Sequence, residues 1–373
     1  MKFIISKEDL VKAIKKVNGG IGVGGSGKDL DYLKISADSE GVTFMTTGRL
    51  LGIKTKVDDH VEVIETGECC TNCRRALEMA TLMPEGMITI RQKDASFFME
   101  SDRCRLKGEV GDLEKVLPFQ SLEGEEQKVC LNAYTFKQMV SDVLFACYRN
   151  EENPQMSSVY FEIEDSEVKV TALDGHQIAV RKEAVKPTGV TASCMIRATI
   201  LTAVMPLIPL NLEKEISLVI GKNRFLLETD TEMVSGALTA GNYFDYSRVF
   251  PEKEPFVKVT IEKALLMDTI ERCAYALMPA GSGINPKPTI LEIDQTIRVH
   301  MNGKIVVEEE LTADVEGGTL KIGISPAIMK GILKVYPEDE VGIKFYGPKE
   351  PIVFTGETAK FLQLPVNIGK QTN

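Results

Sequence analysis

Three short segments carry residue types that could bind phosphate, coordinate a metal or transfer protons. The stretch from Gly22 to Asp29 has the glycine spacing and the lysine of a phosphate-binding loop. However, Asp29 stands where such a loop needs a Ser or Thr hydroxyl, and the stretch follows a predicted helix rather than a buried strand. The sequence therefore favours a surface loop, with nucleotide binding as the alternative.

The second segment, from Cys69 to Cys73, contains a C-x-x-C pair of the kind that binds zinc or exchanges disulfides. The chain has no second pair of this kind to complete a tetrahedral site, and its histidines, His60, His176 and His300, are not close to this one in sequence. We therefore predict small apolar thiols at a helix start, and no metal or cofactor.

The third segment places Asp174 two residues before His176, which resembles part of an acid–base pair. No serine or cysteine nucleophile occurs in a recognisable setting, and no glycine-rich phosphate cradle is nearby. We predict that these two residues shape a turn and that the protein is not an enzyme.

Length and composition limit the remaining possibilities. A chain of 373 residues is too long for one core, so more than one domain is expected. The eight scattered cysteines indicate a reducing compartment, and no segment is apolar enough for a signal peptide or a membrane span, so we predict a cytoplasmic protein without membrane contact. The net charge of -10 argues against binding to nucleic acid unless the Lys and Arg residues gather on particular helices or strands.

One order of elements occurs three times along the chain. Each copy begins with an alternating strand that leads into an apolar helix, predicted over 7–17, 134–149 and 261–277. Ser6, Asn132 and Thr260 stand where these helices need an N-cap. A hairpin follows in each copy, and its predicted apolar pairs are Leu33/Ile35 with Val42/Phe44, Phe161/Ile163 with Val168/Val170, and Leu291/Ile293 with Ile297/Val299.

A second helix, predicted over 72–82, 197–208 and 325–336, ends near a proline in each copy and is followed by another strand. Strands outnumber helices and do not alternate with them in the parallel manner. The sequence therefore predicts an α+β fold of three repeated domains, 1–125, 126–253 and 254–373, each with two helices packed on antiparallel sheet. The six helices carry more Lys and Arg than Asp and Glu although the whole chain is acidic; ordinary solvated helix faces are the alternative reading of that bias.

At full length the sequence resembles the bacterial sliding clamp family, the beta subunit of DNA polymerase III. The resemblance rests on an ordered set of segments: Met1 to Phe3, Thr171 to Ala179, Tyr243 to Pro251, and Phe361 to Val366. It implies a head-to-tail homodimer whose repeated domains close into a ring around double-stranded DNA without reading its sequence. By this resemblance the DNA-facing side chains are Lys12, Lys15, Lys16, Arg74, Arg75, Lys137, Arg149, Arg197, Lys263, Arg272, Lys330 and Lys334.

The resemblance also implies an apolar pocket between the second and third domains. This pocket would accept short linear peptides from the DNA polymerase III alpha subunit, the clamp loader and repair polymerases. Its matching residues are Thr171, Leu173, Gly175, His176, Gln177, Ile178, Phe244, Arg248, Val249, Leu362, Leu364, Pro365 and Val366. Gln177 replaces a usual basic residue, Phe244 a usual proline, and Val366 a usual longer apolar side chain.

For the dimer interface, the resemblance implies a basic strand in the first domain that faces an acidic run in the third, with apolar contacts nearby. The residues concerned are Arg103, Arg105, Leu106, Lys107, Tyr275, Ala276, Glu308, Glu309 and Glu310. Both charge runs would alternatively be solvated strand edges that deter aggregation. The expected function is that of a processivity clamp for the replicative polymerase; the alternatives are a divergent paralogue that serves repair or mobile-element replication, and a nucleotide-dependent enzyme.

Overall fold

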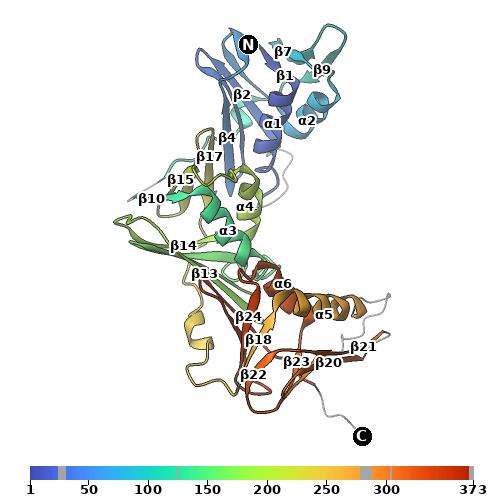
Figure 1. Cartoon of the computed structure of the whole chain (residues 1–373). Coiled ribbons are helices and arrows are strands. Elements are labelled where there is room, and N and C mark those ends of the chain that lie inside the picture. Colours follow the sequence, from blue (N-terminus) through green and yellow to red (C-terminus); the bar gives the residue numbers. More distant parts are fainter. Residues whose placement is uncertain (24–30, 123, 125, 278–287, 303–304, 369–373) are drawn as a thin grey trace. The chain divides into compact units, whose positions relative to one another are not determined.

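The computed structural model describes residues 1–373 except 24–30, 123, 125, 278–287, 303–304 and 369–373. The chain forms two compact units (Figure 1). Unit 1 comprises Met1–Lys137 and Thr188–Ala240, and unit 2 comprises Gln138–Pro187 and Gly241–Asn373. The three domain ranges expected from the sequence stay a prediction.

Unit 1 contains two antiparallel sheets. The first has the order β5 (Val61–Glu65), β1 (Lys2–Ser6), β7 (Met87–Lys93), β8 (Ser96–Glu100) and β9 (Arg105–Glu109). The second has the order β10 (Gln127–Asn132), β15 (Glu215–Ile220), β16 (Arg224–Glu228), β17 (Glu232–Ala237), β4 (Leu51–Val57), β3 (Gly41–Thr47), β2 (Tyr32–Asp38) and β6 (Gly67–Asn72). The predicted hairpin of the first copy is present, because Ile35 pairs with Phe44 across β2 and β3.

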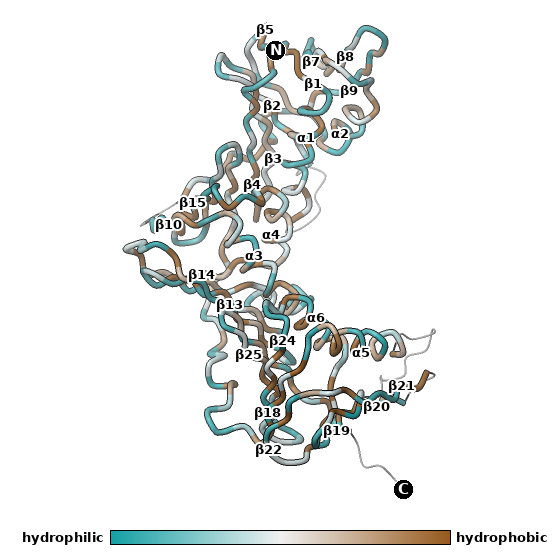
Figure 2. The backbone as a smooth tube through the Cα atoms, in the orientation of Figure 1, coloured by the Kyte–Doolittle hydropathy of each residue, from teal (hydrophilic) through white to brown (hydrophobic). Residues whose placement is uncertain are grey.

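Unit 2 carries a long sheet and a smaller one. Its long sheet has the order β11 (Ser158–Glu164), β12 (Glu167–Leu173), β13 (Gln177–Ala184), β26 (Ala359–Gln363), β25 (Ile352–Thr355), β24 (Glu340–Phe345), β18 (Val257–Glu262) and β22 (Asp314–Gly317). Its smaller sheet has the order β21 (Val306–Leu311), β20 (Ile297–Asn302), β19 (Thr289–Ile293) and β23 (Leu320–Ile324). Figure 2 shows apolar residues recurring along β18, β24 and β25, whose buried side chains form the core under the helices.

The six α-helices of the described chain come in the order that the repeat predicts. They are α1 (Lys7–Asn18), α2 (Cys73–Leu82), α3 (Ala133–Leu144), α4 (Ala198–Val204), α5 (Lys263–Ala276) and α6 (Pro326–Val335). A 3-10 turn, η3 (Met205–Leu207), extends α4, and β14 (Thr191–Arg197) precedes it. In unit 1, α1 packs beside α2, and in unit 2, α5 packs beside α6 (Figure 1). No helix in the described part of the chain is long and apolar enough to cross a membrane.

One hydrogen bond recurs in all three copies. The first N–H group of each leading helix donates to a carbonyl in the loop after the second helix, because these N–H groups have no partner within their own helix. The pairs are Lys7 N to Gly86 O at 2.9 Å, Ala133 N to Lys214 O at 2.9 Å, and Lys263 N to Asp339 O at 2.8 Å. This contact ties the two helices of each copy together at the same point.

The structure corrects two helix boundaries. Thr260 is not an N-cap, because β18 continues to Glu262 and α5 starts at Lys263 without a side-chain cap. The helix predicted to reach Arg149 ends at Leu144, where Ala146 N and Cys147 N bond three residues back in tight turns. By contrast, Ser6 accepts from Asp9 N and Asn132 accepts from Thr135 N, both at 3.0 Å, so these two caps are confirmed.

Candidate functional site

An apolar cluster lies on one face of the long sheet in unit 2. Its buried members are Leu173, Ile178, Phe250, Val353 and Leu362. Four of them stand in a line across neighbouring strands, since Leu173 pairs with Ile178, Ile178 with Leu362, and Leu362 with Val353. Residues directly opposite each other in an antiparallel sheet point to the same face. The strand register therefore brings together the two sequence segments that carried the predicted pocket.

Sequence reasoning found only part of this cluster. Val249 and Leu364 were predicted and pack against it half-buried. The residues that it missed are Met156, Val180, Tyr243, Tyr246, Phe250, Tyr346 and Val353. The alternation of β12, β13, β25 and β26 pointed to Val180 and Val353, whereas the others come from loops and turns that periodicity does not describe.

A turn at Asp174 shapes one side of the cluster. The Asp174 Oδ1 atom accepts from His176 N at 2.9 Å and from Gln177 N at 3.0 Å. Gly175 takes a φ of +87°, a conformation that favours glycine. The carboxylate thus holds the backbone of the turn, as predicted, while the His176 side chain is exposed.

Gln177 lies on the opposite face of the sheet from Ile178. Its amide donates to Asp174 Oδ2 at 2.8 Å, and the side chain is buried. The structure therefore separates Gln177 from the apolar cluster, although the two share a strand. Thr171 is also buried.

The segment before Phe250 covers the cluster with aromatic rings. Tyr243 stacks on Tyr160 with ring centroids 4.8 Å apart, and burial raises the pKa of Tyr243. The Tyr246 hydroxyl donates to Glu162 Oε2 at 2.6 Å. Between these anchored rings, Phe244 is 56% exposed, so its ring is available to a ligand.

The remaining predicted pocket residues lie at the border of the described cluster. Arg248 is 85% exposed, and its Nε atom is 2.6 Å from Asp245 Oδ2. Pro365 and Val366 are half-buried, and Val366 N donates to Gly323 O at 2.8 Å. This backbone contact fixes the segment that follows β26.

The predicted DNA-facing cations fall into two groups. Five are held by the protein itself: Lys16 by Glu232, Lys137 by Ile208 O, Lys263 by Tyr336 O, Arg272 by Glu309, and Lys330 by Glu271. Among the others, Arg197 ends β14, and the exposed side chains are those of Lys12, Lys15, Arg74, Arg75, Arg149 and Lys334. A cavity of about 800 Å³ beside α1 is lined by Lys12, Lys15 and Lys16 together with the apolar Pro206 and Leu207.

The basic strand expected at a dimer interface is the edge strand β9. Arg105 is tied within unit 1, because its Nε atom is 2.8 Å from Glu100 Oε1 and its guanidinium lies 4.6 Å from the Phe98 ring centroid. Arg103 and Lys107 are exposed, and Leu106 is half-buried. The edge of this sheet thus presents two cations around one apolar side chain.

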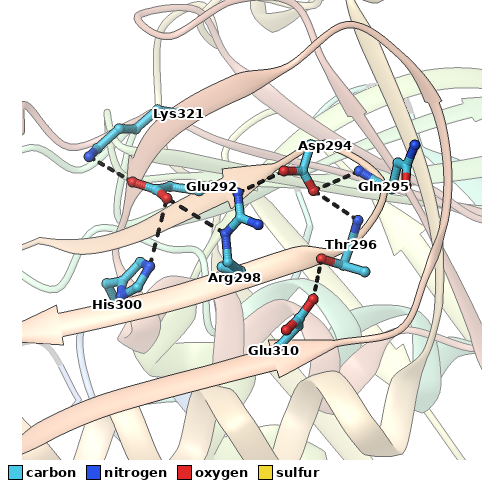
Figure 3. Close-up of polar contacts among 8 residues, drawn as sticks. All are labelled: Glu292, Asp294, Gln295, Thr296, Arg298, His300, Glu310 and Lys321. Carbon is cyan, nitrogen blue, oxygen red and sulfur yellow. Dashed lines mark hydrogen bonds and ion pairs between the residues drawn. The ribbon is translucent and has the colours of Figure 1, made fainter.

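The acidic run lies on β21, the edge strand of the smaller sheet in unit 2. Strand alternation divides it, because Glu309 turns toward α5 and accepts from Arg272 and from Thr269 Oγ1 at 2.7 Å. Glu310 lies on the other face and accepts from Thr296 Oγ1 at 2.8 Å (Figure 3). That face carries an ion network centred on Glu292, whose oxygens approach Lys321, Arg298 and His300 (Figure 3).

Apolar side chains adjoin this acidic strand. Tyr275 is 67% exposed and Val306 is 58% exposed, while Ala276 is buried. They line or border a cavity of about 650 Å³ between α5 and β21, together with Glu308 and Glu309. An edge strand with exposed apolar and charged side chains can pair with another edge of opposite charge.

The three cysteines from Cys69 to Cys73 are buried. Burial raises the pKa of the Cys69 and Cys73 thiols to about 12, so they stay protonated near neutral pH. Among the described residues, no group of His, Cys, Asp and Glu is placed to hold a metal ion. The predicted glycine-rich loop falls largely on residues 24–30, outside the described part of the chain.

Comparisons with known proteins give one consistent result. Residues 130–245 match the model of the DNA polymerase III beta subunit, central domain. The chain is 24% identical over 299 residues to the beta sliding clamp of Staphylococcus aureus. The aligned residues cover 79% of this chain and 78% of that protein. The same identity and coverage hold for the beta sliding clamp of Staphylococcus epidermidis.

The fold is similar to solved structures over nearly the whole chain. A putative DNA polymerase III beta subunit from Eubacterium rectale superposes with a TM-score of 0.92 at 23% identity, covering 99% of this chain and 100% of that chain. The DNA polymerase sliding clamp from Bacillus subtilis gives a TM-score of 0.91 at 23% identity, covering 98% and 99%. The predicted α+β fold is confirmed.

Proposed function

We propose that this chain, which belongs to the DNA polymerase III beta sliding clamp family, closes with a second copy into a ring around duplex DNA and holds polymerases there. The observation that carries the proposal is the match in element order and fold over nearly the full chain. The protein is a non-catalytic subunit, and its action is to keep partners near DNA by topology rather than by sequence-specific contacts.

Partner docking in this proposal takes place on the apolar cluster of unit 2. A short linear peptide buries one or two Leu or Phe side chains against Leu173, Ile178 and Leu362, because a few desolvated apolar anchors supply most of the affinity of such contacts. Candidate partners are the polymerase alpha subunit, the clamp loader and repair polymerases.

Ring closure in this proposal joins β9 of one copy to β21 of the other. Arg103 and Lys107 would meet the acidic strand, and Leu106 would meet Tyr275. Sedimentation of a variant with Leu106→Asp and Tyr275→Asp tests this, since buried unpaired carboxylates should give monomers. A variant that still sediments as a dimer would refute the interface.

The central test uses topology. The purified protein, loaded onto a nicked circular plasmid and isolated by gel filtration, should stay bound until a restriction enzyme cuts the circle, and then slide off. Retention on the linear product would refute the ring. For docking, Leu364→Ala with Val366→Ala should abolish binding of a polymerase-derived peptide in a fluorescence titration while the plasmid test is unchanged.

A divergent paralogue is the second candidate function. It is favoured by the exposed Phe244 and the buried Gln177, which replace residue types usual for the family. Replacement of a resident replicative clamp by this chain in cells distinguishes the two functions, because a replicative clamp would restore growth and a specialised paralogue would not.

A further inference from the structure

The line of side chains that forms the apolar cluster continues across three further strands of the long sheet. Val353 of the cluster pairs with Lys344 on β24, Lys344 pairs with Lys258 on β18, and Lys258 pairs with Glu316 on β22. Buried and exposed residues alternate along β18, and Lys258 is exposed between the buried Val257 and Val259. The exposed Lys258 and the half-buried Lys344 therefore lie on the same face of the sheet as the apolar cluster.

This arrangement sets two cations directly opposite each other. Like charges at directly opposite positions of an antiparallel pair destabilise a sheet. Lys258 and Lys344 have no ion-pair partner in the described part of the chain, and Glu316, although opposite Lys258 in the register, is not within ion-pair distance of it. Folding alone does not explain why cations occupy both positions.

A third lysine adds to the charge beside the cluster. Lys360 on β26 places its Nζ atom 4.1 Å from the ring centroid of Phe250, a member of the cluster. Burial, and then repulsion by Lys344, lowers the pKa of Lys360. The positive potential from these side chains thus adjoins the apolar surface instead of lying on a remote part of the sheet.

The carboxylates near Lys258 and Lys344 interact with other side chains. Glu350 pairs with Lys253 at 2.7 Å, and Glu162 is taken by Tyr246 and Lys169. Burial raises the pKa of Tyr346, and the nearby charge of Glu254 raises it further. None of these carboxylates forms an ion pair with Lys258 or Lys344 in the described residues.

We propose that Lys258 and Lys344 form a second contact for docked peptides and select those with acidic side chains next to their apolar anchors. This inference rests on the proposed docking function and names the class of peptide that the site prefers. Neighbouring strands are about 4.8 Å apart and an extended peptide rises about 3.3 Å per residue. The acidic residues therefore lie about one to three positions from the anchor beside Val353.

Fluorescence anisotropy with synthetic peptides tests the inference. Each probe has a fluorescein label and the core Leu-Ala-Leu-Phe, with Gly-Glu-Glu after the core or Glu-Glu-Gly before it. Matched probes carry Gln in place of Glu. The wild-type protein should bind one of the Glu probes about three- to tenfold more tightly than its Gln match at low salt, because two partly exposed ion pairs contribute about that much. The preference should shrink as salt is added.

A double variant identifies the lysines responsible. K258Q with K344Q should bind Glu and Gln probes equally, while its affinity for the Gln probes stays at the wild-type value, which also shows that the variant is folded. The matched control is K93Q with K128Q, which removes the same charge from two exposed strand lysines of unit 1. It should keep the full preference.

The possible failures are distinguishable. Equal binding of Glu and Gln probes by the wild-type protein, in both orders, would overturn this inference and leave apolar docking intact. A preference that persists in K258Q with K344Q would also overturn it. Absence of binding by every probe would overturn both the inference and the proposed docking site.

Discussion

Replacement of Lys16 by methionine should destabilise unit 1 more than its surface position suggests. Lys16 forms an ion pair with Glu232, whose side chain is only 5% exposed, against 27% for the lysine. Glu232 also accepts from Thr229 Oγ1 at 2.6 Å and from Thr231 Oγ1 at 2.8 Å. The pair links α1 to β17, two elements that are far apart in the sequence.

The expected magnitude follows from the burial of the carboxylate. Removal of one partner of a buried pair costs about 3–5 kcal/mol, because the other charge stays desolvated. The partial exposure of Lys16 reduces this to about 2–3 kcal/mol, since water screens part of the interaction. For a unit of this size, that loss lowers the melting temperature by roughly 4–12 °C.

Differential scanning fluorimetry at pH 7 measures the effect, with Lys15→Met as the control. Lys15 is an exposed neighbour on the same helix, so its loss should leave the melting temperature nearly unchanged. Addition of Glu232→Gln to Lys16→Met should restore much of the stability, because the amide carbonyl still accepts from the two threonines. Equal melting temperatures for Lys16→Met and Lys15→Met would refute the reasoning.

The stability lost in Lys16→Met should depend on pH. Burial raises the pKa of Glu232, but hydrogen bonds from Lys16, Thr229 and Thr231 outweigh it and hold the pKa below its usual value. Because the pKa of Glu232 is lower in the folded state than in the unfolded state, where it is about 4.3, the carboxylate stabilises the fold at pH values above about 4.3. This contribution is lost as the pH falls through the folded-state pKa. The difference in stability between wild type and Lys16→Met should therefore narrow as the pH falls below about 4.3.

Three further outcomes follow from buried groups. Burial raises the pKa of the Cys194 thiol to about 12, so iodoacetamide at pH 8 should spare it in the native protein and alkylate the exposed Cys130, as read by peptide mass spectrometry. Gly236→Ala should cost about 1–3 kcal/mol in urea unfolding, because the added methyl would lie 2.2 Å from the Phe225 ring. Burial raises the pKa of Asp142 to about 6, above the unfolded value of about 3.9, so its contribution to stability is present below pH 4 and is lost as the pH rises through 6. The melting temperature of Asp142→Asn relative to wild type should therefore increase from pH 5 to pH 7.5, and a constant difference would count against this assignment.

Local patterns predicted the elements better than they predicted the contacts. The pairs Phe161 with Val170 and Leu291 with Val299 occur as expected, because strict alternation fixes which face a strand buries. Alternation also predicts that Glu309 faces away from Glu310, so the three acids from Glu308 to Glu310 do not form one surface. Internal partners such as Glu232 for Lys16 come from distant elements, so no local pattern reveals them.

The end of α3 at Leu144 shows another limit of prediction from local patterns. Apolar residues recur at helical spacing through Cys147, and periodicity does not distinguish a continuing α-helix from the tight turns that follow Leu144. Tyr148 N donates to Met156 O at 3.0 Å, a closure that only the folded loop provides. That loop brings Met156 to the apolar cluster, a position that no local pattern predicts.

The pairing of β13 with β26 has a consequence for synthesis. Gln177 pairs with Gln363, so one edge of β13 finds its neighbour only after the ribosome has produced every strand between β13 and β26. Until then that edge exposes unpaired backbone groups, which invite pairing with other nascent chains. Because contacts between residues far apart in the sequence form slowly, we expect the pairing of β13 with β26 to be a late step in folding, at which chaperones act.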